Sequence, residues 1–187
     1  MTLTPINSGW IEVICGNMFS GKTEELIRRL RRAEIAKMST VIFKPKIDSR
    51  FSKDHIVSHN NNKLESHMIS YPKDILRLAK KYEVIGIDEV QFLDDSIVDV
   101  CKVLASENKR IIAAGLDTDY LGKPFGPMPK MMCEADYLDK LRAICVSCGN
   151  PASYTQRTST DADQVVLGEL DKYEARCRNC FKLPIDN

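Results

Sequence analysis

An eight-residue segment, GNMFSGKT at residues 16–23, constrains the fold of this chain more than any other feature. It matches the pattern G-x-x-x-x-G-K-[ST]. It lies between an apolar run, WIEVIC (10–15), and a segment with helical spacing of apolar residues (22–37). The glycines allow a tight turn in which backbone N–H groups point at phosphate oxygens, and the following helix adds its N-terminal dipole. A glycine turn without function is the alternative, and the strand–loop–helix context argues against it.

Two residues of this loop have specific expected roles. Lys22 is expected to reach the β- and γ-phosphates of a nucleotide, and Thr23 to offer its hydroxyl to Mg²⁺. A second motif, VIGIDE, ends an apolar run with Asp88 and Glu89. In that position Asp88 would complete the Mg²⁺ shell, and Glu89 would be free to act as a general base. A solvated charge at the strand end is the alternative for Glu89.

Apolar runs alternate with helical patterns along the rest of the chain. Strands are predicted at 10–15, 39–44, 83–92 and 109–117, and helices at 22–37, 71–82 and 94–108. Strands that alternate with helices imply an α/β fold with a parallel sheet and helices on both faces. The polar stretch after Pro45, with His55, His59 and His67, is expected to be a solvated loop, as is the Gly- and Pro-rich segment 118–129.

Four of the seven cysteines form two C-x-x-C pairs, Cys145 with Cys148 and Cys177 with Cys180. Four thiolates suit tetrahedral Zn²⁺ with no open position, so a structural site is predicted, although the insert between the pairs is longer than in the usual zinc ribbon. A redox pair is the alternative, but redox C-x-x-C motifs usually occur singly. The insert is predicted to be a polar loop, closed at its base by the metal, that acts as a lid over a bound molecule.

The remaining cysteines, Cys15, Cys101 and Cys133, are expected to be buried small hydrophobic residues in a reducing compartment. The N-terminal segment lacks the basic and apolar regions of a signal peptide, and no apolar run approaches the roughly 20 residues of a membrane span. A cytoplasmic location without a membrane partner is therefore expected. The formal net charge of only +1 argues against a protein that coats nucleic acid.

Several motifs together resemble one family. In chain order they are GNMFSGKT, ELIRRLRR, FKPKIDSR, IDEVQF, GLDTDYLGKPFG and ASYTQR…GELDKYEARCRNC, and they extend from about Gly9 to Phe181. Each is weak alone, but in this order they are specific, and the chain resembles the type II, zinc-containing thymidine kinases. The resemblance implies an α/β, P-loop NTPase-like (RecA-like) kinase domain over residues 1–143 and a small zinc-ribbon or lasso lid domain over 144–187.

The resemblance also implies a reaction. The γ-phosphoryl group of ATP would pass to the 5′-hydroxyl of thymidine, and also of deoxyuridine, giving dTMP and ADP from thymidine in pyrimidine salvage. Glu89 is then the base that takes the proton from that hydroxyl. Structural Zn²⁺ and Mg²⁺ with ATP are the implied cofactors. A homotetramer and feedback inhibition by dTTP are implied as well.

Further residues take roles from the resemblance by position. The implied ATP-binding set is Gly16, Asn17, Met18, Phe19, Ser20, Gly21, Lys22, Thr23, Asp48, Ser49, Arg50, Asp88, Glu89, Val90 and Gln91. The implied nucleoside-binding set is Met18, Phe92, Leu116, Tyr120, Gln164, Val165, Val166, Leu167, Gly168 and Tyr173. The implied zinc ligands are Cys145, Cys148, Cys177 and Cys180, and the implied Mg²⁺ ligands are Thr23 and Asp88. Three residues depart from the family pattern: Tyr120 stands where many relatives have Phe, Glu169 adds a charge to the lid, and Thr23 replaces Ser, which is chemically neutral at a Mg²⁺ hydroxyl position.

Two other functions are compatible with parts of the sequence. A zinc-ribbon P-loop ATPase that binds single-stranded nucleic acid would use the arginine-rich segment 28–32, but the near-neutral charge and the lack of a basic, aromatic-rich tail argue against it. The arginines are instead expected to form a solvated helix face. A binding-only homologue is the second alternative, and the presence of both Lys22 and Glu89 argues against that one.

Overall fold

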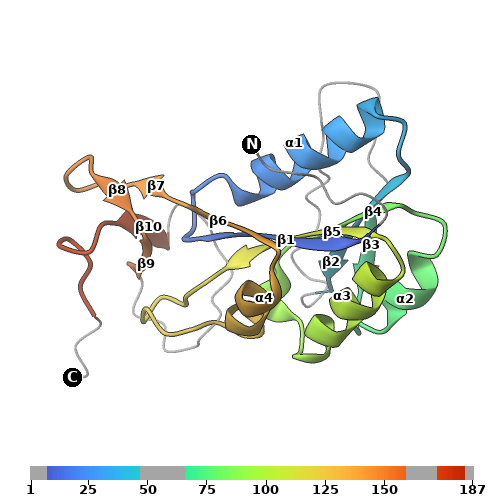
Figure 1. Ribbon diagram of the computed structural model, residues 1–187. Coiled ribbons are helices and arrows are strands. Elements are labelled where there is room, and N and C mark those ends of the chain that lie inside the picture. The colour runs from blue at the N-terminus through green and yellow to red at the C-terminus, as the bar shows by residue number, and fades with distance from the viewer. Residues whose placement is uncertain (1–7, 47–65, 159–171, 184–187) are drawn as a thin grey trace.

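The computed structural model describes residues 8–46, 66–158 and 172–183, and its centre is a sheet of six parallel strands (Figure 1). The strands are β1 (Trp10–Gly16), β2 (Thr40–Pro45), β3 (Ser66–Ile69), β4 (Val84–Ile87), β5 (Arg110–Leu116) and β6 (Tyr137–Leu141). Their order across the sheet is β3-β2-β4-β5-β1-β6. The helices are α1 (Lys22–Ile35), α2 (Asp74–Leu78), α3 (Ser96–Ser106) and α4 (Met128–Glu134), with a 3₁₀ turn, η1 (Val90–Phe92). Within these described ranges, no helix is both long and apolar enough to cross a membrane.

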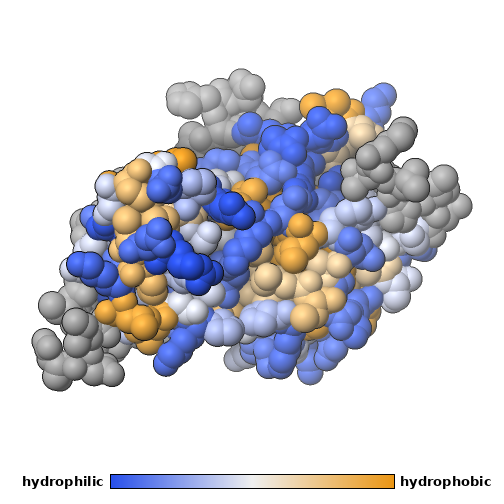
Figure 2. Space-filling model, turned by 60° about the vertical axis from the view of Figure 1, so that its left-hand side comes forward, coloured by the Kyte–Doolittle hydropathy of each residue, from blue (hydrophilic) through white to orange (hydrophobic). Residues whose placement is uncertain are grey.

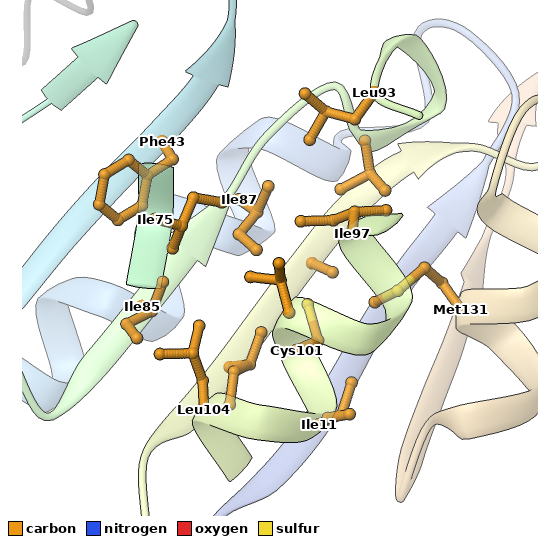
Figure 3. Packing of buried hydrophobic residues seen from close by; sticks show 14 of the residues in the cluster. Ile11, Phe43, Ile75, Ile85, Ile87, Leu93, Ile97, Cys101, Leu104 and Met131 are labelled. Atoms are coloured by element: carbon orange, nitrogen blue, oxygen red, sulfur yellow. The ribbon is translucent and has the colours of Figure 1, made fainter. Parts of the chain in front are cut away.

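Helices cover both faces of the sheet, as the alternating pattern predicts (Figure 1). Helix α1 lies on one face, and α2, α3 and α4 lie on the other. Successive strand residues point to opposite faces, so one strand supplies both cores. In β1, for example, Val13 and Cys15 join the core under α3 and α4, whereas Ile14 joins the core under α1. Figure 3 shows the larger core, where Cys101 and Leu104 of α3 pack toward strand residues such as Ile85.

The core under α1 depends on a close approach between the helix and β4. Leu26, Leu30 and Ala33 of α1 are buried, as their helical spacing predicts. Gly86 faces this helix, and a Cβ atom at that position would lie 2.7 Å from a methyl carbon of Leu30. The absence of a side chain therefore lets α1 lie close to the sheet, which fixes the position of the helix N-terminus that follows the glycine loop.

One arginine of α1 was expected in solvent and is not. The side chain of Arg29 is 13% exposed and forms ion pairs with Glu12 (2.7 Å), Glu25 (2.8 Å) and Asp139 (2.6 Å). Glu12 also pairs with Arg110 of β5 at 2.6 Å. The prediction of a solvated face is wrong for Arg29, because carboxylates on α1, β1 and β6 converge on its guanidinium and connect the helix to two strands.

Several element predictions need correction. The helix predicted at 71–82 is confined to Asp74–Leu78, and the strand predicted at 83–92 ends at Ile87. The strand ends early because Glu89 adopts a left-handed backbone conformation (φ 55°), which turns the chain into η1. The segment 118–129 was predicted as loop, but α4 begins at Met128 with Pro129 in its first turn, where the missing N–H of proline costs nothing.

Two single-residue expectations are also wrong. His67 does not lie in a solvated loop. It is in β3, half-buried, and its ring stacks on Phe43 with centroids 5.6 Å apart. Cys133 is exposed, whereas Cys15 and Cys101 are buried as expected. Burial raises the pKa of the Cys15 thiol to about 11 and that of Cys101 to about 12, so both stay protonated and behave as small hydrophobic residues. His55 and His59 lie outside the described residues.

A small second unit follows β6, at the end of the sheet where the strands terminate (Figure 1). We call residues 143–158 and 172–183 the cysteine unit. It contains two antiparallel pairs, β7 (Ala143–Ile144) with β8 (Pro151–Ala152) and β9 (Tyr154–Arg157) with β10 (Tyr173–Arg176). The segment between the C-x-x-C pairs was predicted as loop, but its two described flanks are partly strand. The buried apolar core of the unit holds only three alanines and two cysteines, with a third cysteine packed against it.

Candidate active site

The glycine loop between β1 and α1 has the backbone shape that its sequence predicts. Gly16 (φ 143°), Phe19 (φ 65°) and Gly21 (φ 83°) all have positive φ, and Gly21 is the residue before α1. A Cβ atom on Gly16 would lie 2.5 Å from the carbonyl oxygen of Leu141, so a larger residue does not fit there. Ser20 Oγ and Lys22 Nζ each donate to the carbonyl oxygen of Asn17 at 2.8 Å. The lysine ammonium therefore lies over the loop, where a phosphate chain would bind.

The acidic end of β4 lies beside this loop. Asp88 is 2% exposed, and the hydroxyl of Thr23 is 3.3 Å from each of its carboxylate oxygens. Lys44, at the end of the neighbouring strand β2, pairs with Asp88 at 3.0 Å. Hydroxyl and carboxylate oxygens are the ligands that Mg²⁺ takes beside nucleotide phosphates, so Thr23 and Asp88 fit that role. Lys44 was not predicted as a site residue, although a charge at the end of a buried strand was the available signal.

Glu89 is held by its neighbours in a half-buried position. Its carboxylate accepts a hydrogen bond from Gln91 Nε2, and Gln91 Oε1 in turn accepts from the backbone N–H of Leu116 at 2.9 Å. Gly126 makes room for this arrangement, because a Cβ atom there would lie 2.3 Å from the carbonyl oxygen of Gln91. Burial, together with the negative charge of Asp88, raises the pKa of Glu89 above its ordinary value. The alternative of a solvated strand-end charge is therefore wrong for Glu89.

Burial shifts the pKa of Lys22 in the opposite direction to that of Glu89. It lowers the pKa of the ammonium, while the carboxylates of Glu89, Asp88 and Asp117 act to raise it. Asp117 follows β5 at the same edge of the sheet, is 5% exposed, and pairs with Lys140 of β6 at 2.5 Å. Neither Asp117 nor Lys140 was singled out in the sequence. In parallel sheets, ligands bind at the carboxyl ends of the strands, where these charged groups meet.

The aromatic residues implied for the nucleoside pocket form two separate groups of contacts. Phe92 packs edge-on against Phe125, with centroids 5.6 Å apart. Tyr120, in the loop after β5, lies under the guanidinium of Arg157, whose central carbon is 3.5 Å from the ring centroid. Arg157 also donates to the hydroxyl of Tyr173 at 2.9 Å. The family resemblance implies roles for Phe92, Tyr120 and Tyr173. Arg157 was not predicted, because nothing in its local sequence reveals this packing.

The glycine loop is bonded directly to the cysteine unit. Asn17 is fully buried, and its side-chain amide donates to Tyr154 O (3.3 Å) and accepts from Ala143 N–H (3.4 Å). The next backbone N–H, that of Met18, donates to Thr155 Oγ1 at 3.0 Å. The phosphate-binding loop and the cysteine unit therefore share a hydrogen-bond network, which no sequence motif indicates.

Four cysteine thiols converge at the far end of the cysteine unit. The Sγ atoms of Cys145, Cys148, Cys177 and Cys180 all lie within 4.8 Å of one another, and none forms a disulfide. Tetrahedral zinc with Zn–S bonds of about 2.3 Å places its sulfurs roughly 3.8 Å apart. The Cys148 and Cys177 sulfurs are 3.6 Å apart, which is close to that value. The four residues therefore fit a structural metal site. Figure 2 shows this side of the protein, where hydrophobic residues are interspersed with hydrophilic ones. Ile144 and Val146 of the cysteine unit are exposed.

Comparison with known proteins agrees with this geometry. The sequence model of the thymidine kinase family matches residues 9–181. The chain belongs to the thymidine kinase family. A thymidine kinase from Rhodothermus sp. (strain ITI 518) is 54% identical over 94% of this chain and 83% of its own length. A thymidine kinase from Bacteroides thetaiotaomicron is 51% identical over 92% of this chain and 87% of its own length.

A solved structure supports the fold alone. The flagellar accessory protein FlaH from Methanocaldococcus jannaschii aligns with a TM-score of 0.54 at 14% identity, covering 84% of this chain and 76% of that one. Together with the six-stranded parallel sheet and the glycine loop, this similarity establishes the P-loop NTPase-like fold class. It carries no information about substrate.

Not every residue that the thymidine kinase resemblance implies for the site can be placed. The structure brings the loop 16–23 and the segment 88–91 together at one edge of the sheet. Within the second segment, the side chain of Val90 belongs to the core under α3. Leu116 and Met18 are half-buried near these elements. Asp48, Ser49, Arg50 and the lid residues Gln164, Val165, Val166, Leu167 and Gly168 lie outside the described residues.

Proposed function

We propose that the protein transfers the γ-phosphoryl group of ATP to the 5′-hydroxyl of thymidine, releasing dTMP and ADP. One observation carries the proposal: in a chain of the thymidine kinase family, the phosphate-binding loop and the half-buried Glu89, whose pKa is raised, lie at one edge of the sheet. Phosphoryl transfer needs a cradle for ATP, a base for the acceptor hydroxyl and exclusion of water. We assign the ATP cradle to residues 16–23, the base to Glu89 and the exclusion of water to the aromatic side chains described above.

Glu89 is proposed as the general base. A carboxylate that removes a proton from a hydroxyl is more effective when its pKa lies closer to the working pH, and the raised pKa of Glu89 meets that condition. Gln91 holds one carboxylate oxygen and is itself fixed by Leu116 N–H, so the base has a defined orientation. Lys22, and Arg50 from the family resemblance, are proposed to stabilise the charge on the transferred phosphoryl group.

The proposed cofactors follow from the donor sets. Mg²⁺ bound with ATP would neutralise phosphate charge, and Thr23 and Asp88 are the residues proposed to hold it. Zinc is proposed at the four thiols, where it would crosslink two short hairpins that have a very small apolar core. We also propose that the remaining residues implied by the resemblance bind ATP or the nucleoside.

Other parts of the proposal rest on the family resemblance alone. We propose the division into a kinase domain (1–143) and a lid domain (144–187), a homotetramer, inhibition by dTTP, acceptance of deoxyuridine, a role in pyrimidine salvage and a cytoplasmic location. Size-exclusion chromatography with light scattering tests the assembly. A dTTP titration at fixed thymidine tests the inhibition.

A nucleoside panel tests the reaction itself. The purified protein is incubated with Mg-ATP and, separately, thymidine, deoxyuridine, deoxycytidine, deoxyguanosine or single-stranded DNA. ADP release and the mass of the nucleotide product are measured. Thymidine-dependent ADP release with formation of dTMP supports the proposal. ADP release that is stimulated only by single-stranded DNA would instead support an ATPase that binds nucleic acid, and the kinase proposal would be abandoned.

A further inference from the structure

We propose that Arg157 is a positioning residue for the nucleoside pocket, because it holds two proposed pocket walls, Tyr120 and Tyr173, at a fixed separation. The inference rests on the proposed function, since these tyrosines are assigned to the pocket there. Arg157 is not assigned to contact substrate. Its effect on thymidine binding would be transmitted through the two rings.

The two walls come from different parts of the fold. Tyr120 lies in the loop between β5 of the sheet and α4, and Tyr173 is the first residue of β10 in the cysteine unit. Within the described residues, no backbone hydrogen bond is found between the loop 117–125 and β10. Side-chain contacts are therefore the direct link between the two rings.

Arg157 contacts both rings at once. Its guanidinium carbon lies 3.5 Å from the Tyr120 ring centroid, and a terminal nitrogen donates to the Tyr173 hydroxyl at 2.9 Å. Arg157 is only 7% exposed, and its position opposite Tyr173 in the β9–β10 ladder fixes its backbone. A planar, rigid guanidinium can stack on one ring while it donates to another, which the ammonium of lysine cannot reproduce.

The loop that carries Tyr120 is rigid enough to transmit this contact. Asp119 Oδ1 accepts from the backbone N–H groups of Leu121 (2.9 Å) and Lys123 (3.0 Å), which closes a tight turn around Tyr120. A second contact seats the same turn against the cysteine unit. Tyr154 and Phe181 stack with centroids 4.5 Å apart, and each ring would lie within 3.7 Å of a Cβ atom on Gly122. Arg157 thus acts at a junction where both sides are already ordered.

The test separates thymidine binding from ATP binding. Arg157→Met keeps the length of the side chain and removes both the charge and the planar donor group. We expect the KM for thymidine to rise by roughly 10-fold or more, the scale of one desolvated cation–π contact or one charged hydrogen bond, with the KM for ATP within about 2-fold of the parent value. Arg157→Lys should restore little of the loss. Arg178→Met is the matched control, because Arg178 is an exposed arginine of the same unit that lies over Tyr154, 5.2 Å from its ring centroid, and this variant should keep the parent KM for thymidine.

Three results would overturn the inference. They are an unchanged KM for thymidine in Arg157→Met, an equal rise in the KM for both substrates, and full recovery in Arg157→Lys. If Arg157→Met does not fold, Tyr173→Phe replaces it. That variant loses only the hydroxyl that accepts from Arg157, and it should raise the KM for thymidine selectively, while an unchanged value counts against the inference. Failure of the parent protein to phosphorylate thymidine would instead refute the proposed function, so the two failures are distinguishable.

Discussion

Glu89 combines two properties that normally oppose each other, a negative charge and burial. The substitution Glu89→Gln keeps the shape and removes the charge, so the glycine loop and the pair of Thr23 with Asp88 should persist. We expect kcat to fall by roughly 10²- to 10⁴-fold, the usual contribution of general acid–base catalysis, with ATP affinity little changed. Steady-state kinetics and titration with a fluorescent ATP analogue measure the two quantities. Near-normal turnover would rule out Glu89 as the base.

The raised pKa of Glu89 also predicts how stability depends on pH. The folded protein binds this proton more tightly than the unfolded chain does, so the cost of the buried charge is absent below the unfolded pKa. This cost lowers the stability of the folded protein as pH rises through the pKa that Glu89 has in the folded state. Glu89→Gln lacks the charge and should be more stable than the parent protein at neutral pH, with the difference disappearing toward pH 4. Urea unfolding at several pH values measures this. A variant that is less stable at neutral pH would contradict the assigned burial cost.

At the scale of elements, the bond between the glycine loop and the cysteine unit is the feature with the most direct consequences. Asn17→Ala would leave the buried Ala143 N–H without its partner, at a cost of about 1–3 kcal/mol, and would remove the side-chain donor to the part-buried Tyr154 carbonyl. We expect lower stability in urea and a higher KM for ATP, because the loop loses its support. Asn17→Ser shortens the side chain but keeps a hydroxyl, and should show a smaller loss. Parent-like values for both quantities in Asn17→Ala would show that the link is not needed.

The strands β1, β2, β4 and β5 were predictable from sequence, whereas contacts between elements were not. Runs such as VIF in β2 are apolar because both faces of the sheet are covered, and that pattern is visible locally. Strand β3 (SHMI) is a short edge strand in a polar stretch, and α4 begins among prolines, so neither has a clear local signal. In the same way, Lys22, Asp88 and Glu89 follow from motifs. Lys44 and Arg157 become relevant only when the fold brings Asp88 and Tyr120 to them.

At the scale of the whole molecule, the sheet domain and the cysteine unit meet through three sets of contacts. They are the hydrogen bonds of Asn17 and Met18, the guanidinium of Arg157 on Tyr120, and the packing of Gly122 against Tyr154 and Phe181. We expect this junction to affect both proposed substrates, since the first set supports the glycine loop and the other two support the proposed nucleoside wall. We therefore expect activity to depend on whether the cysteine unit is folded, even though the thiols themselves lie at a distance from the proposed site.

Metal removal tests this coupling directly. The cysteine unit has too small an apolar core to hold its two hairpins alone, so removing zinc with a chelator should unfold the unit before the sheet domain and raise the KM for thymidine. Differential scanning calorimetry should show a separate transition at lower temperature, and re-addition of zinc should reverse both effects. Cys145→Ser should reproduce the chelated state, whereas Cys133→Ser, at an exposed cysteine outside the cluster, should retain stoichiometric zinc and parent kinetics. A Cys145→Ser protein with full zinc content and unchanged thermal stability would refute the structural role, because the crosslink between the hairpins would then not depend on the four thiols.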